Sequence, residues 1–123
     1  MVIIDRRLSP RYKVDFSVDL TIIPHSEAEP LTAQAVELSL SGIRLRCTRP
    51  VEQRLVTQSA YVPVWWIHFK PPGYAERITV HARLTTQCRV DREHYHLGFH
   101  FIESSAKNGQ LLSGYLRQLF SEG

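Results

Sequence analysis

The sequence has no apolar stretch long enough to cross a bilayer. Its longest apolar stretch, residues 61–69, is interrupted by Pro63 and His68, whereas a membrane-spanning helix needs roughly 20 consecutive apolar residues. The apolar part of the amino terminus, Met1 to Ile4, is too short for a secretory signal peptide. We therefore expect a cytoplasmic protein without a transmembrane segment.

Cysteine is scarce, and its placement argues against cysteine-based sites. Cys47 and Cys88 lie far apart in sequence and show no metal-ligand spacing. Without a secretory signal, we expect both to stay reduced. His94, His96 and His100 share one face of a predicted strand, but no Cys or Asp stands at zinc-motif spacing from them. We expect these histidines to be solvated rather than to bind metal, although one could line a ligand site.

Catalytic and polynucleotide-binding patterns are also missing. The sequence shows no recognisable Ser/His/Asp or Cys/His arrangement, no glycine-rich phosphate loop and no carboxylate pair with an obvious acidic role. The sequence contains fifteen Lys and Arg residues and twelve Asp and Glu residues, so it is only mildly basic. A general nucleic-acid binder would carry a larger basic patch. A groove for single-stranded nucleic acid would need exposed aromatic residues, and most of those here occupy inward positions. We therefore expect that the protein is not an enzyme and does not bind a nucleic-acid polymer.

Period-two alternation of apolar and polar residues dominates what is present. This alternation is typical of half-buried strands, and 123 residues suit one domain with a single core. Because Pro50 and a Thr-Gln-Ser run interrupt residues 48–60, we expect an irregular connection there. The predicted strands are residues 14–22, 31–38, 43–47, 61–69, 78–90 and 94–102.

The alternation also predicts which side chains face inward. In the last part of the second strand, Leu38 faces inward, while Glu37 and Ser39 lie together on the outer face. One residue of the pair Trp65 and Trp66 must face inward, and the other lies under a helix or marks a homodimer contact. Other predicted inward residues are Val14, Phe16, Val18, Leu20, Ile22, Val36, Leu40, Ile43, Leu45, Cys47, Tyr95, Leu97, Phe99 and Phe101.

A helix is predicted at the carboxyl end. Ser104 or Ser105 can cap it, while Gly109 and Gly114 each lower its propensity by about 1 kcal/mol. The helix therefore needs tertiary packing, which we expect over one opening of a barrel. Patterning alone predicts a mainly β barrel or sandwich. The apolar stripe of this helix comprises Leu111, Leu112, Tyr115, Leu116, Leu119 and Phe120.

A basic arm, residues 1–12, precedes the first strand. It contains Arg6, Arg7 and Arg11, and Pro10 disfavours a helix there. Guanidinium groups are planar and permanently charged, which suits phosphate oxygens and purine edges. We expect a flexible, extended arm that folds over a ligand; the alternative is a solvated basic terminus.

Two motifs together resemble the PilZ domain, the bacterial receptor family for cyclic di-GMP. Arg7 and Arg11 match the Arg-x-x-x-Arg arm of that family. Ser39 and Gly42 match its Asp/Asn-x-Ser-x-x-Gly motif, in which Glu37 replaces the Asp or Asn. The sequence His-Leu-Gly-Phe-His-Phe also looks like the last barrel strand of the family. The resemblance implies a small antiparallel barrel of about six strands with a C-terminal helix, over residues 13–123.

The resemblance also implies a ligand and a site. An arginine just before the arm motif tends to accompany two stacked cyclic di-GMP molecules, so Arg6 implies two molecules per chain, with no other cofactor. Glu37 could accept hydrogen bonds from guanine, although it is longer than Asp; the alternative is an exposed glutamate without a role. The expected cyclic di-GMP site comprises Arg6, Arg7, Arg11, Glu37, Ser39, Gly42 and Gly98.

We therefore expect a stand-alone cyclic di-GMP receptor that relays this second-messenger signal to an unidentified protein partner. Ordering of the arm on binding would change the surface that the partner meets. The alternative function is a PilZ-fold adaptor that binds proteins but not cyclic di-GMP. The replacement at Glu37 favours the alternative, while the pair Arg7 and Arg11 favours the receptor.

Overall fold

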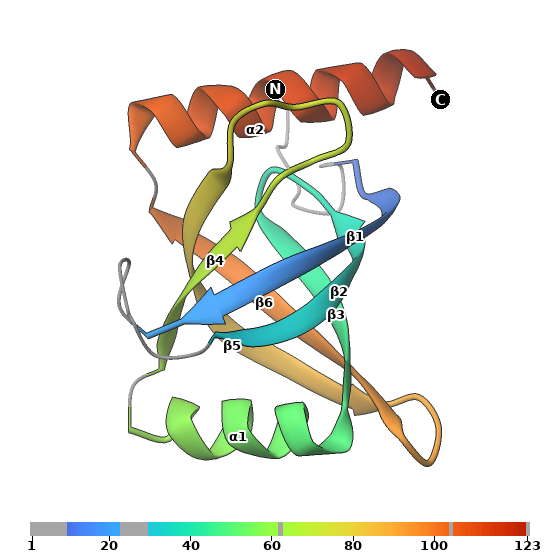
Figure 1. The fold of residues 1–123 in the computed structure, drawn as a ribbon, viewed down its shortest axis with the longest axis vertical. Coiled ribbons are helices and arrows are strands. Elements are labelled where there is room, and N and C mark those ends of the chain that lie inside the picture. Colours follow the sequence, from blue (N-terminus) through green and yellow to red (C-terminus); the bar gives the residue numbers. More distant parts are fainter. Residues whose placement is uncertain (1–9, 23–29, 62, 104, 123) are drawn as a thin grey trace, which may run out of the picture.

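The computed structural model describes residues 10–22, 30–61, 63–103 and 105–122. All six strand pairings are antiparallel, and the strands close into a barrel in the order β1-β2-β3-β6-β5-β4. This arrangement confirms the predicted mainly β, six-stranded antiparallel barrel with a C-terminal helix (Figure 1). The elements are β1 (Tyr12–Thr21), β2 (Leu31–Leu38), β3 (Gly42–Thr48), α1 (Arg49–Ser59), β4 (Val64–Phe69), β5 (Ile78–Arg89), β6 (His94–Glu103) and α2 (Ala106–Glu122).

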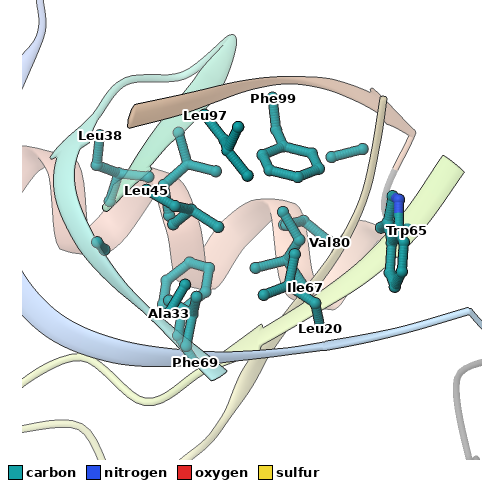
Figure 2. Packing of buried hydrophobic residues seen from close by; sticks show 14 of the residues in the cluster. Leu20, Ala33, Leu38, Leu45, Trp65, Ile67, Phe69, Val80, Leu97 and Phe99 are labelled. Atoms are coloured by element: carbon teal, nitrogen blue, oxygen red, sulfur yellow. The ribbon is translucent and has the colours of Figure 1, made fainter. Parts of the chain in front are cut away.

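The barrel interior is filled by the inward-facing residues of all six strands, as Figure 2 shows. Most are aliphatic or aromatic, and burying one such side chain contributes about 1.5–3 kcal/mol. Trp65 is buried and its indole N–H donates to the Ser59 hydroxyl at 2.9 Å. Trp66 faces the other way and stacks on His81 with ring centroids 4.3 Å apart. The predicted opposition of the two tryptophans is therefore confirmed.

The two helices lie across opposite ends of the barrel (Figure 1). In α2, Leu112, Tyr115 and Leu116 are buried, and the Tyr115 ring packs edge-on against Phe16 at 6.2 Å. The Ser105 hydroxyl accepts a hydrogen bond from the backbone N–H of Asn108 at 3.2 Å, which is the predicted N-terminal cap. The barrel supplies the packing that the glycine-containing helix needs.

The prediction of an irregular connection over residues 48–60 is wrong, because α1 occupies most of it. Pro50 lies in the first turn of the helix, where its missing N–H costs no intrahelical hydrogen bond. Leu55 is fully buried beneath the barrel. Besides Leu55, only Glu52 is buried in this helix. Tertiary packing therefore stabilises a helix whose own apolar pattern is weak.

A β-bulge in β2 sets the orientation of Glu37. The pairing with β3 shifts between Ala35 and Glu37, so Val36 is an extra residue on β2. Ala35 faces inward before the bulge and Leu38 faces inward after it, which leaves Glu37 on the outer face. Val36 itself is only half-buried, so the prediction that it faces the core is wrong.

Several strand ends differ from the prediction. Leu40, predicted to face inward, lies in the turn after β2 and is 57% exposed. Ile22 lies beyond the end of β1 and is also exposed. Pro63 precedes the first residue of β4, so that strand begins later than predicted. Tyr12, assigned to the arm, already belongs to β1, and residues 1–9 of that arm lie outside the described residues.

Within the part of the chain that the structure describes, neither helix combines the length and apolar character needed to span a membrane.

The register of β6 yields a prediction about stability. Phe99 is buried in the barrel, whereas the neighbouring His100 lies on the outer face and is half-buried. We expect Phe99→Ala to destabilise the protein by about 3–5 kcal/mol and His100→Ala by about 0.5 kcal/mol or less. Urea unfolding of the two variants measures both values. A larger loss for His100→Ala would contradict the register, since a slip of one residue exchanges the two faces.

Candidate functional site

A pocket of about 180 Å³ opens on the outer wall of the barrel, where the turn between β2 and β3 meets β5 and β6. The structure brings five of the predicted site residues together around it: Arg11, Glu37, Ser39, Gly42 and Gly98. The other two, Arg6 and Arg7, lie outside the described residues. The pocket lining also includes His100, one of the three histidines considered for a ligand site, and the side chains of Arg44, Thr85 and Thr86, which were not predicted.

The turn between β2 and β3 forms one rim of the pocket, and Ser39 holds it in shape. The Ser39 N–H donates to the Gly42 carbonyl at 3.0 Å. The Ser39 hydroxyl accepts from the backbone N–H groups of Ser41 and Gly42, each at 3.2 Å. The Ser41 carbonyl accepts from the Phe101 N–H at 2.8 Å, which fixes the turn to β6. The buried Ser39 side chain therefore organises the backbone of the rim.

Two glycines form a floor without side chains. A Cβ atom at Gly42 would overlap the carbonyl oxygen of Phe99, and a Cβ atom at Gly98 would overlap the Thr86 hydroxyl. Thr85 is an extra residue where the pairing of β5 with β6 shifts, and its hydroxyl donates to the Gly98 carbonyl at 3.1 Å. Close strand packing therefore requires Gly42, while a side chain at Gly98 would displace the Thr86 hydroxyl. The two glycines leave the backbone accessible to a flat ligand.

Two guanidinium groups approach Glu37 from opposite sides. Arg11 Nη1 lies 3.4 Å from Glu37 Oε1, and Arg44 Nη1 lies 3.8 Å from Oε2. The Arg11, Arg44 and Glu37 side chains are 60%, 42% and 25% exposed, respectively. Ion pairs this exposed typically contribute only about 0–1 kcal/mol. Arg11, the more exposed of the two arginines, can therefore exchange its contact with Glu37 for a contact with an anionic ligand at little cost.

The histidines of β6 differ in their relation to the pocket. His100 lines it, directly across from Gly42. His96 lies further along the strand, and burial together with the nearby charges of Arg44 and Arg46 lowers its pKa. His96 is therefore neutral at pH 7 and adds no charge beside the pocket. The expectation that one histidine lines the site fits the position of His100.

His94 belongs to the hairpin between β5 and β6. Its Nδ1 atom lies 3.0 Å from the Asp91 carboxylate. Asp91 also accepts the backbone N–H groups of Glu93 and His94. These hydrogen bonds, first that from Glu93 and then that with the His94 ring, lower the pKa of Asp91. No group of three or more His, Cys, Asp or Glu side chains in the described ranges is arranged to hold a metal ion.

The pocket therefore combines three chemical features. Arg11 and Arg44 supply cationic, planar hydrogen-bond donors, and the Glu37 carboxylate supplies an acceptor. The glycine floor admits a ring close to the backbone. Such a set suits a flat ligand that carries both an anionic group and a hydrogen-bonding edge.

Arg44 could have been found from the sequence. Arg44 lies between the predicted inward residues Ile43 and Leu45, so alternation places it on the outer face with Glu37. A hairpin around the turn pairs Leu38 with Ile43 and Glu37 with Arg44. Counting back from the turn would have identified that pair. Thr85 and Thr86 gave no comparable signal, because their approach to Gly98 depends on a bulge in a pairing between distant strands.

Comparison with solved structures finds barrels of the same fold. K. pneumonia MrkH in complex with c-di-GMP has a TM-score of 0.71 at 15% identity, covering 98% of this chain and 55% of that one. The inhibitor of motility MotI/DgrA from Bacillus subtilis has a TM-score of 0.65 at 14% identity, covering 98% and 54%. The PilZ domain of YcgR from Escherichia coli, solved with c-di-GMP, has a TM-score of 0.59 at 14% identity, covering 96% and 94%.

The chain spans about half the length of MrkH and MotI/DgrA, but nearly all of the YcgR PilZ domain. A search of curated protein sequences finds no significant match. The model of the PilZ domain family matches residues 5–118, which is nearly the whole chain. Together with the six-stranded barrel, this match shows that the chain belongs to the PilZ domain family.

Proposed function

We propose that this chain is a receptor for cyclic di-GMP and binds it in the pocket between the β2–β3 turn and β6. The observation that carries the proposal is the convergence of Arg11, Glu37, Gly42 and Gly98 on one pocket. Membership of the PilZ family supports it, as do the MrkH and YcgR structures, which contain c-di-GMP.

Each group has a chemical role in the proposed complex. Arg7 and Arg11 bind phosphate oxygens and the O6 and N7 acceptors of guanine, since a guanidinium group can donate two parallel hydrogen bonds. Glu37 accepts from the N1–H and N2–H₂ donors of a guanine edge. Gly42 and Gly98 let the guanine rings approach the backbone, and Ser39 maintains the turn that positions Gly42.

The proposed output is a change of surface rather than catalysis. Arg6 and Arg7 close over the bound dinucleotide, and a protein partner in the cytoplasm recognises the altered surface. The second candidate function, a PilZ-fold adaptor that does not bind cyclic di-GMP, is favoured by one observation. Glu37 replaces the Asp or Asn of the family motif and is engaged by Arg11 and Arg44 in the free protein.

Calorimetric titration distinguishes the two functions and gives the stoichiometry. We expect cyclic di-GMP to bind, and cyclic di-AMP to bind much more weakly, because adenine offers no O6 acceptor to arginine and no N1–H donor to Glu37. With Arg6 present, we expect two cyclic di-GMP molecules per chain, and Arg6→Leu should lower the stoichiometry toward one. Absence of binding would support the adaptor. One molecule per unmodified chain would refute the role of Arg6 alone.

The arm arginines should carry much of the affinity. We expect Arg7→Ala and Arg11→Ala each to cost about 1.5–3 kcal/mol, roughly ten- to a hundred-fold in affinity, because each removes a charge-assisted contact. Arg92→Ala is the matched control, since Arg92 lies in the exposed β5–β6 hairpin away from the pocket. Circular dichroism should show an intact fold in all three. Unchanged affinity in either arm variant would remove that arginine from the site.

The sign of the effect at Glu37 tests its role. If Glu37 accepts from guanine, Glu37→Ala should weaken cyclic di-GMP binding by about 1–3 kcal/mol, because the guanine donors lose their acceptor. Glu37→Asp should keep or raise the affinity, since the shorter side chain loses less rotamer freedom. Tighter binding by Glu37→Ala would show that Glu37 only repels the anionic ligand.

A further inference from the structure

Arg44 lines the pocket together with Arg11 and Glu37. It lies on β3, directly across from Glu37 on β2 and from Gly98 on β6. Because Gly98 has no side chain, the β6 flank of Arg44 opens into the pocket. On the other flank its guanidinium faces the Glu37 carboxylate, with Nη1 at 3.8 Å from Oε2.

The two oxygens of Glu37 have different partners. Oε1 lies toward Arg11, which is the residue just before β1, while Oε2 lies toward Arg44. In the proposed complex, Arg11 moves onto the dinucleotide, which frees Oε1 to accept from guanine. The backbone of Arg44 is paired with β2 on one side and β6 on the other, which keeps its side chain beside Oε2 when the arm moves.

This retained contact lowers the conformational entropy that the longer Glu37 side chain loses when the ligand binds. Glutamate has one more rotatable bond than aspartate, and fixing it on binding costs additional conformational entropy. A second contact at Oε2 limits those rotamers before the ligand arrives, which is preorganisation. The positive charge of Arg44 also offsets the repulsion between the carboxylate and the phosphates.

We propose that Arg44 is a positioning residue, which holds Oε2 of Glu37 so that its carboxylate can accept the N–H groups of a guanine base of cyclic di-GMP. This inference rests on the proposed function. It explains how a pocket with Glu37, in place of Asp or Asn, retains recognition of guanine. A direct contact between Arg44 and a phosphate is the main competing role, and the two roles differ in their dependence on Glu37.

A double-mutant cycle measures that dependence. Cyclic di-GMP is titrated by calorimetry into the unmodified protein, Arg44→Ala, Glu37→Asp and the double variant. We expect Arg44→Ala to weaken binding about ten-fold in the unmodified background but less than about two-fold in the Glu37→Asp background, because the shorter carboxylate no longer depends on Arg44. Arg44→Lys should recover part of the affinity lost in Arg44→Ala, since an ammonium group can also contact Oε2.

Arg46→Ala is the matched control. Arg46 is the next outward arginine of β3, but its guanidinium pairs with Asp91, with Nη2 at 3.6 Å from Oδ2. Its removal subtracts the same charge from the same strand, so a general electrostatic effect would appear in both variants. We expect Arg46→Ala to weaken binding less than about two-fold in either background.

The possible outcomes separate the inference from the proposed function. Equal losses for Arg44→Ala in both backgrounds would show a direct ligand contact and overturn the positioning role. No loss in either background would overturn it as well. If the unmodified protein did not bind cyclic di-GMP, the proposed function itself would fail, and the inference with it. Circular dichroism of each variant confirms that a loss of binding is not a loss of folding.

Discussion

The β-bulge at Val36 is the constraint on which the pocket depends. With strict period-two alternation, Glu37 would follow Ala35 into the barrel, where an unpaired carboxylate is very costly to bury. The extra residue reverses the alternation, so Leu38 enters the core and Glu37 faces outward between β1 and β3. The bulge therefore satisfies the core and presents the carboxylate at the same time.

The rest of the pocket follows from how closely the strands approach. A side chain at Gly42 would overlap the Phe99 carbonyl, and one at Gly98 would displace the Thr86 hydroxyl. The same absence of side chains opens the floor to a ring system. The proposed binding and the fold thus both favour glycine at these two positions, and a substitution there should affect both.

The sequence was most informative where a periodic pattern of apolar residues is typical of only one kind of secondary structure. Alternation located the strands, and the stripe with Ser105 located α2. α1 was missed because Leu55 is its one buried apolar residue, while Pro50 resembled a loop signal. Leu40 was misplaced because alternation carries no mark of where a strand ends. The helix α1 is decided by packing between segments distant in sequence, whereas the position of Leu40 is decided by the turn that Ser39 holds.

In the candidate site too, some residues could be predicted from a local pattern and others could not. Glu37 and Gly42 could be identified by the spacing of a motif within one hairpin, while Thr85 and His100 reach the pocket only through the registers of β6 with its two neighbours. A motif defines residue types along one segment, whereas a pocket depends on the alignment of several strands. The contact between Arg44 and Glu37 lies between these cases, because one hairpin register suffices to reveal it.

The central claim is that this pocket is where the chain recognises cyclic di-GMP. The most direct test is a titration of ¹⁵N-labelled protein with cyclic di-GMP, followed by amide chemical shifts in NMR spectra. The account predicts that the largest shifts cluster at residues 37–44 and 98–100, with little change in α1 or the β5–β6 hairpin. Largest shifts in α1 or that hairpin, or no shifts at saturating ligand, would contradict it.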